Sequence, residues 1–92
     1  MTQKTIVLGA EFDDDLRTDL VEVLRNIGAT VTQAERAMAG SQELERTTAM
    51  LRGNVIVIEA ETYMGLSITG HESDLAEITS LIAQRRRSMG RA

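Results

Sequence analysis

The longest regular pattern in the chain is an alternation of apolar and polar side chains over residues 55–69. The even-numbered positions form the mainly apolar side, and these are Ile56, Ile58, Ala60, Thr62, Met64, Leu66 and Ile68. A period of two is typical of a β-strand with one buried and one wet face. The stretch is predicted to be either one long bent strand or a hairpin that turns near Glu61 and Thr62, and the pattern alone leaves both open.

Two other segments repeat their apolar residues every three or four positions, which predicts amphipathic helices with a single apolar stripe. The first helix follows Asp13–Asp15, ends before Gly28, and has its stripe at Leu16, Leu20, Val23, Leu24 and Ile27. Carboxylates at its start and a glycine after its end suit both ends of a helix. The second follows Gly70, with its stripe at Leu75, Ile78, Leu81 and Ile82.

The remaining elements are predicted to be strands. Residues 4–9 and 29–37 are short and partly β-branched, and the order strand, helix, strand predicts that these two strands pair in parallel through a right-handed crossover. The polar second half of 29–37 indicates an edge strand or a loop before Gly40. Residues 41–52 fit either a helix or a strand, and Gly53 and Asn54 between apolar residues favour the strand because they are typical of a hairpin turn.

Together these elements predict a single α+β domain over residues 1–87 and a frayed tail over 88–92. The expected fold is a two-layer sandwich in which two helices pack on one face of a 4–5-stranded, mostly antiparallel sheet, in the order β-α-β-β-β-(β)-α. This arrangement resembles the ferredoxin-like sandwich in architecture but lacks the final strand of that fold. A likeness of architecture implies no function.

Composition narrows the function classes. The chain has 92 residues, of which 42% are hydrophobic and 26% charged, as in ordinary globular domains, and it has no cysteine and one histidine. It therefore offers no disulfide, thiolate metal site or multi-histidine metal site, and we expect no cofactor. The amino-terminal apolar run is too short for a signal sequence or a membrane span, so a cytoplasmic location without membrane contact is expected.

The charge is unevenly distributed. The net charge is −4, but all 14 acidic residues and six of the ten basic residues precede Arg85, which makes the protein body strongly acidic. The last eight residues hold a basic tail of Arg85, Arg86, Arg87 and Arg91. An acidic body with only two aromatic residues argues against nucleic-acid binding, so weak contact through the basic tail is the last of three functional hypotheses. Placement in a helix's final turn, where cations complement the dipole, explains the arginines more simply.

Two further groups of residues are candidate sites. An acidic cluster at the start of the first helix could hold a metal ion, although helix capping is the simpler interpretation; its members are Glu11, Asp13, Asp14 and Asp15. The wet face of residues 55–69 is a candidate interaction surface because it mixes apolar and polar side chains, namely Val55, Val57, Glu59, Glu61 and Tyr63.

These observations support one leading hypothesis and one alternative from another class. The leading hypothesis is a small, non-enzymatic interaction module that forms a homodimer through its sheet or binds another protein. The alternative is a small enzyme that depends on a divalent cation or on acid/base chemistry by Glu59, Glu61 and Tyr63.

Overall fold

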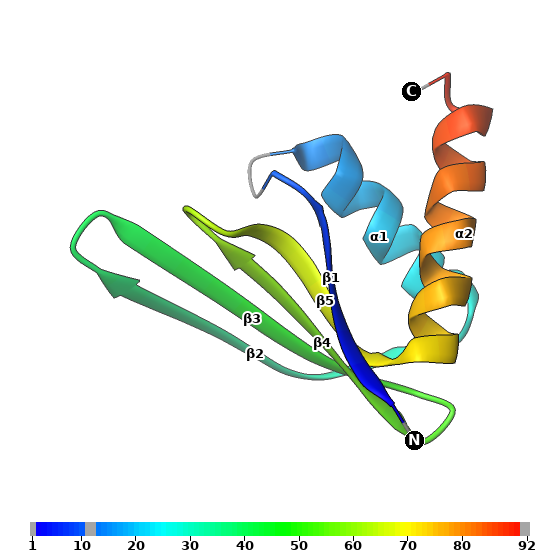
Figure 1. The fold of residues 1–92 in the computed structure, drawn as a ribbon, viewed down its shortest axis with the longest axis horizontal. Coiled ribbons are helices and arrows are strands. Elements are labelled where there is room, and N and C mark those ends of the chain that lie inside the picture. Colours follow the sequence, from blue (N-terminus) through cyan, green and yellow to red (C-terminus); the bar gives the residue numbers. More distant parts are fainter. Residues whose placement is uncertain (1, 11–12, 91–92) are drawn as a thin grey trace.

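Both helices lie on one side of a five-stranded antiparallel sheet (Figure 1). The computed structural model describes residues 2–10 and 13–90. The described elements are β1 (Gln3–Gly9), α1 (Asp14–Asn26), β2 (Thr30–Ala39), β3 (Gln42–Leu51), β4 (Asn54–Glu61), β5 (Gly65–His71) and α2 (Glu72–Ser88). The predicted α+β class, in which two helices pack on one face of a mostly antiparallel sheet, is confirmed.

The strand order is β1-β5-β4-β3-β2, so the first two strands of the chain occupy opposite edges of the sheet. β2 to β5 form a meander of antiparallel hairpins, and β5 then pairs with β1. The predicted parallel pairing of the first two strands is therefore wrong. Tight turns bring successive strands together with little loss of chain entropy, whereas a parallel pair needs a long crossover. The prediction that the second strand lies at an edge is confirmed.

The hairpin turns follow from residues that accept a positive φ. Gly53 and Arg52 form the two-residue loop between β3 and β4 with φ of 82° and 50°, as a type I′ turn requires. Residues 41–52 are thus mainly strand, as Gly53 and Asn54 indicated.

Residues 55–69 form a hairpin rather than one bent strand. Glu61 pairs with Gly65, so the loop holds the three residues Thr62–Met64, and Gly65 follows with φ of 87°. An odd number of loop residues leaves even-numbered side chains on the same face in both strands, so the alternation resumes in phase in β5. Within the loop the predicted inward parity is wrong at Met64, which is 64% exposed. The predicted parity is confirmed in the strands, since Ile56 and Ile68 are fully buried.

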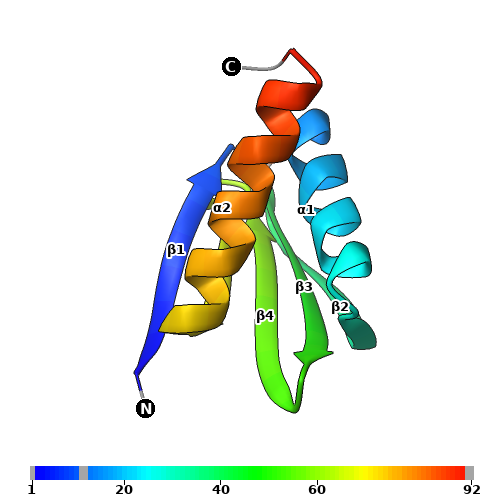
Figure 2. The ribbon, with the colours of Figure 1, turned by 90° about the vertical axis from the view of Figure 1, so that its right-hand side faces the viewer.

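The two helices lie side by side and cover the sheet unevenly (Figure 2). α2 packs on β1 and β5, and α1 packs on α2. Asp13 caps α1 by accepting a hydrogen bond from the Leu16 N–H at 3.0 Å, as expected for an acidic residue at a helix start. The β2–β3 hairpin projects beyond both helices (Figure 1). The side of the sheet that carries Ile56 and Ile68 is called the helix face below, and the other side is called the open face.

No helix among the described residues has both the length and the apolar character needed to span a membrane.

Candidate interaction surface

β2 is an exposed edge strand. All ten of its residues are solvent-exposed, and only one of its two edges is paired, with β3. It contains neither proline nor lysine, the residues that commonly protect an edge strand from pairing with another chain. β1 at the opposite edge is shorter, carries Lys4, and has α2 packed against it. The β2 edge is therefore the less protected of the two.

The backbone groups at this edge follow from the β2–β3 register. A β-bulge lies between Val31 and Gln33, and pairing is regular from Gln33 to Ala39. A two-residue loop joins Ala39 to Gln42, and residues that flank such a loop form a hydrogen-bonded pair. Because hydrogen-bonded and non-hydrogen-bonded pairs alternate, three residues direct their N–H and C=O groups to the free edge, namely Ala34, Arg36 and Met38.

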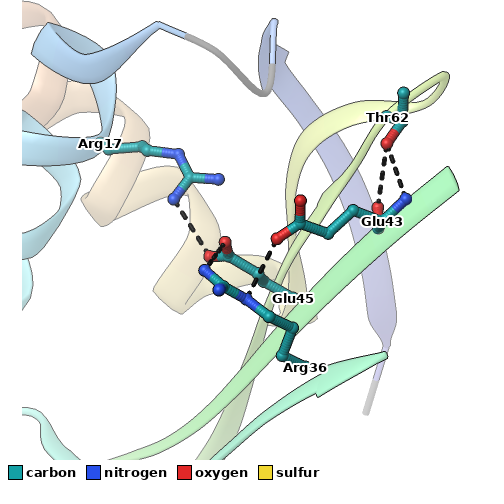
Figure 3. Close-up of polar contacts among 5 residues, drawn as sticks. All are labelled: Arg17, Arg36, Glu43, Glu45 and Thr62. Atoms are coloured by element: carbon teal, nitrogen blue, oxygen red, sulfur yellow. Dashed lines mark hydrogen bonds and ion pairs between the residues drawn. The ribbon is translucent and has the colours of Figure 1, made fainter. Parts of the chain in front are cut away.

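A network of charged side chains lies on the helix face beside this edge (Figure 3). Arg36 Nη2 donates to Glu45 Oε1 at 2.7 Å, and its Nε lies 3.0 Å from Glu43 Oε1. Glu45 also accepts a hydrogen bond from Arg17 of α1 at 3.2 Å. The Thr62 hydroxyl lies 2.8 Å from the Glu43 backbone nitrogen and holds that part of β3 to the neighbouring turn. These contacts fix the Arg36 side chain next to the free edge.

The ion pairs shift the pKa values of Glu45 and Arg36. The hydrogen bond from Arg36, together with the bond and charge of Arg17, holds the pKa of Glu45 below its ordinary value, against the opposing effect of desolvation. The bond to Glu45 and the charges of Glu43 and Glu45 raise the pKa of Arg36. Both side chains are therefore charged at neutral pH.

An apolar groove of about 280 Å³ separates α1 from the β2 side of the sheet. Its lining includes two exposed valines, Val21 on α1 and Val31 on β2, with 51% and 62% of their surfaces exposed. Ile58 also lines the groove and is only partly buried, although the alternation placed it in the core.

Four residues of the predicted interaction surface lie on β4, and the fifth lies in the following loop. The pairing register places Val55, Val57, Glu59 and Glu61 on the open face. Tyr63 is 70% exposed, and its hydroxyl lies 3.4 Å from that of Ser41. The structure thus brings the β4 residues into one row and places the phenol at the end of the sheet.

The carboxylates of this row already have partners. Glu59 Oε2 lies 2.9 Å from Arg46 Nη2, and Glu61 Oε1 accepts a hydrogen bond from the Gln42 amide at 3.0 Å. Both contacts cross from β4 to β3, which makes them cross-strand pairs of the open face.

The acidic cluster at the start of α1 acts in helix capping. Asp13 is the N-cap, and Asp14 and Asp15 lie in the first turn. Glu11 lies outside the described residues. Among residues 2–10 and 13–90, no group of three or more histidine, cysteine, aspartate or glutamate side chains is arranged to hold a metal ion.

The first two arginines of the basic tail hold the helices together. Arg85 Nε lies 2.8 Å from Asp19 Oδ1, and Arg86 Nη1 lies 3.4 Å from Asp19 Oδ2. Arg87 is exposed in the last turn of α2, and Arg91 lies outside the described residues. Arg85 and Arg86 therefore bind Asp19 of the chain itself, which the simple helix-dipole interpretation did not foresee.

The sequence analysis identified the second strand as an edge but did not identify its residues as a surface. The signal was present in the segment Gln33–Ala39, which has no large branched or aromatic apolar side chain and includes the charged residues Glu35 and Arg36. Such a composition suits an exposed strand. The groove could not be foreseen, because it depends on where α1 lies over the sheet.

Comparison of the chain with protein-family models, with curated proteins and with solved structures gives no match.

Proposed function

We propose that this chain is a small, non-enzymatic interaction module that forms a homodimer by pairing the β2 edges of two copies into one continuous sheet. The observation that carries the proposal is the full exposure of β2 along a free edge. An exposed edge strand of this length presents unpaired backbone groups with which another strand can pair. A cytoplasmic location, expected from the composition, is part of the proposal.

A second copy is the partner that needs the fewest assumptions. A two-fold contact uses the same surface patch on both molecules, so one exposed edge is sufficient. The exposed valines of the groove, Val21 and Val31, lie beside the same edge. Edge pairing brings the two patches toward each other, and removing apolar surface from water favours association.

The row of β4 residues on the open face is the other surface available for self-association. Its carboxylates are bonded to Arg46 and Gln42, so this face is satisfied within one copy. By contrast, the backbone groups that β2 directs to the free edge lack partners in the sheet. The edge is therefore preferred over the face as the contact.

The proposal is tested by the mass of the protein in solution. Light scattering after size-exclusion chromatography is expected to give about twice the chain mass of 10.1 kDa at concentrations in the range of about 10 µM to 1 mM. Ala34→Pro is expected to give the single-chain mass. Proline removes an N–H that points to the free edge, so pairing with β3 is retained and circular dichroism is expected to remain that of the folded protein.

Val55→Lys is the matched control, since it places a charge on the open face, where 46% of the valine surface is exposed. This variant is expected to remain a dimer. A protein that is a single chain at every concentration contradicts the proposal. A dimer that survives Ala34→Pro but is lost in Val55→Lys places the contact on the open face instead.

A further inference from the structure

We infer that the two copies pair antiparallel with Arg36 on the two-fold axis, so that Gln33–Ala39 of one copy lies against Ala39–Gln33 of the other. This inference rests on the proposed dimer and assigns its register and its facing residues. It uses the whole regular part of β2, from the bulge to the turn, and Arg36 is the middle residue of that segment.

Strand geometry limits the registers that are available. Only residues that direct their backbone groups to the free edge can face one another as hydrogen-bonded pairs, and these are Ala34, Arg36 and Met38. Facing residues in antiparallel strands also have their side chains on the same side. The helices of both copies must therefore lie on the same face of the continuous sheet. Because the three residues are spaced two apart, the two-fold axis must lie where one residue of β2 faces the same residue of the other copy, not between two residue positions.

The number of hydrogen-bonded pairs favours the axis at Arg36. This register joins Ala34 to Met38, Arg36 to Arg36, and Met38 to Ala34. An axis at Glu35 or at Ala37 leaves two such pairs within the regular segment, and an axis at Ala34 leaves one. Each lost pair removes backbone hydrogen bonds that an unpaired edge can otherwise make only to water.

Side-chain size points to the same register. Around Arg36, each longer side chain faces an alanine of the other copy: Met38 faces Ala34, Glu35 faces Ala37, and Gln33 faces Ala39. Pairing of large with small side chains lets two strands approach without crowding.

The charges of the facing residues also favour the axis at Arg36 over the axis at Glu35. With the axis at Arg36, two arginines face each other, but each is already bonded to Glu43 and Glu45 of its own copy. With the axis at Glu35, two glutamates face each other at a close non-hydrogen-bonded pair. Glu35 accepts a hydrogen bond from the neutral amide of Gln33, and Arg46, which faces it on β3, is bonded to Glu59 instead. The charge of Glu35 is therefore less compensated than that of Arg36. Like charges therefore disfavour the Glu35 axis more.

Cysteine cross-linking tests the register directly, because the chain has no cysteine of its own. Two variants, Glu35→Cys and Ala37→Cys, are prepared separately and then mixed under mild oxidation. With the axis at Arg36, residues 35 and 37 of different copies form a close pair, with Cα atoms about 4.5 Å apart, within the range of a disulfide. Identical residues then lie diagonally, about 7–8 Å apart, which is too far.

The mixture is expected to give a disulfide-linked dimer as the main product, whereas each variant alone gives no more than background. Ala83→Cys, exposed on α2, mixed with Glu35→Cys measures the background from random collision. Cross-linking of Glu35→Cys alone, or of Ala37→Cys alone, moves the axis to that residue and overturns the inference. A dimer by light scattering without any cross-link overturns it too, while a protein without a dimer contradicts the proposed function itself.

Discussion

Arg85 Nε lies 2.8 Å from Asp19 Oδ1, and no part of Asp19 reaches solvent. This contact joins the middle of α1 to the last turn of α2, and Arg86 adds a second contact at 3.4 Å. A buried carboxylate is strongly destabilising unless it is paired, so these arginines balance a charge that would otherwise favour unfolding. The contact ties the carboxyl-terminal helix to the rest of the domain.

Replacement of Asp19 by alanine is therefore expected to lower the free energy of unfolding by about 2 to 4 kcal/mol. The loss has two causes: the ion pairs disappear, and two arginines are left partly enclosed between the helices. Asp14→Asn, at an exposed site in the first turn of the same helix, is expected to cost no more than about 0.5 kcal/mol. Urea unfolding at one fixed protein concentration measures both, and equal losses would show that the buried pairs contribute nothing.

Two isoleucines on β4 test how unevenly the helices cover the sheet. Ile56→Ala is expected to lower the free energy of unfolding by about 3 to 4 kcal/mol, because Ile56 is fully buried and the change leaves a cavity. Ile58→Ala is expected to cost about half as much, because Ile58 lines the groove and is only partly buried. The same unfolding assay compares them, and a larger loss at Ile58 would mean that the groove is closed in solution.

The helices and the inward parity of residues 55–69 could be predicted from the sequence because each depends on local periodicity, although the choice between one bent strand and a hairpin stayed open. The stripe from Leu16 to Leu24 is buried as predicted, and the inward parity of Ile56 and Ile68 is correct. The tight turn between β3 and β4 could also be predicted locally, because Gly53 readily adopts the positive φ that the turn at Arg52 and Gly53 requires. In each case, the residues that set the structure are close together in the chain.

The strand order and the roles of single charged residues could not be predicted in the same way. The order of the strands depends on which of several antiparallel partners β1 meets, and its own residues do not specify β5. The partnership of Asp19 with Arg85 spans most of the chain, so neither residue signals it alone. The exposed edge of β2 depends on the same long-range choice, because any strand could have covered it.

Alanine substitutions at two glycines with positive φ compare the cost of backbone strain alone with the cost of strain plus a steric clash. Gly40 and Gly65 have φ of 61° and 87°, so alanine is disfavoured at both. A Cβ at Gly40 meets open space, and Gly40→Ala is expected to cost about 1 kcal/mol. A Cβ at Gly65 would run into the carbonyl oxygen of Gly9 on β1, so a loss of at least about 2 kcal/mol is expected there. Thermal unfolding compares them, and equal losses would indicate that β1 moves freely at this point.

Glu45 links α1 to the β2 edge, and its contribution to stability depends on pH. Because the ion pairs hold its folded-state pKa below the ordinary value of 4.5, the charged carboxylate stabilises the folded protein above that pH, and the contribution is lost as pH falls through the lower folded pKa. Glu45→Gln is thus expected to cost about 0.5 to 1 kcal/mol near neutral pH, and the difference from the natural protein should shrink as pH falls below the ordinary value and through the lowered folded-state pKa. Glu61→Gln is the matched control, since Glu61 bonds to the neutral amide of Gln42 and should show a smaller change. Urea unfolding at several pH values follows both variants, and a Glu45→Gln difference that stays constant in acid would show that its partners do not favour the charged form.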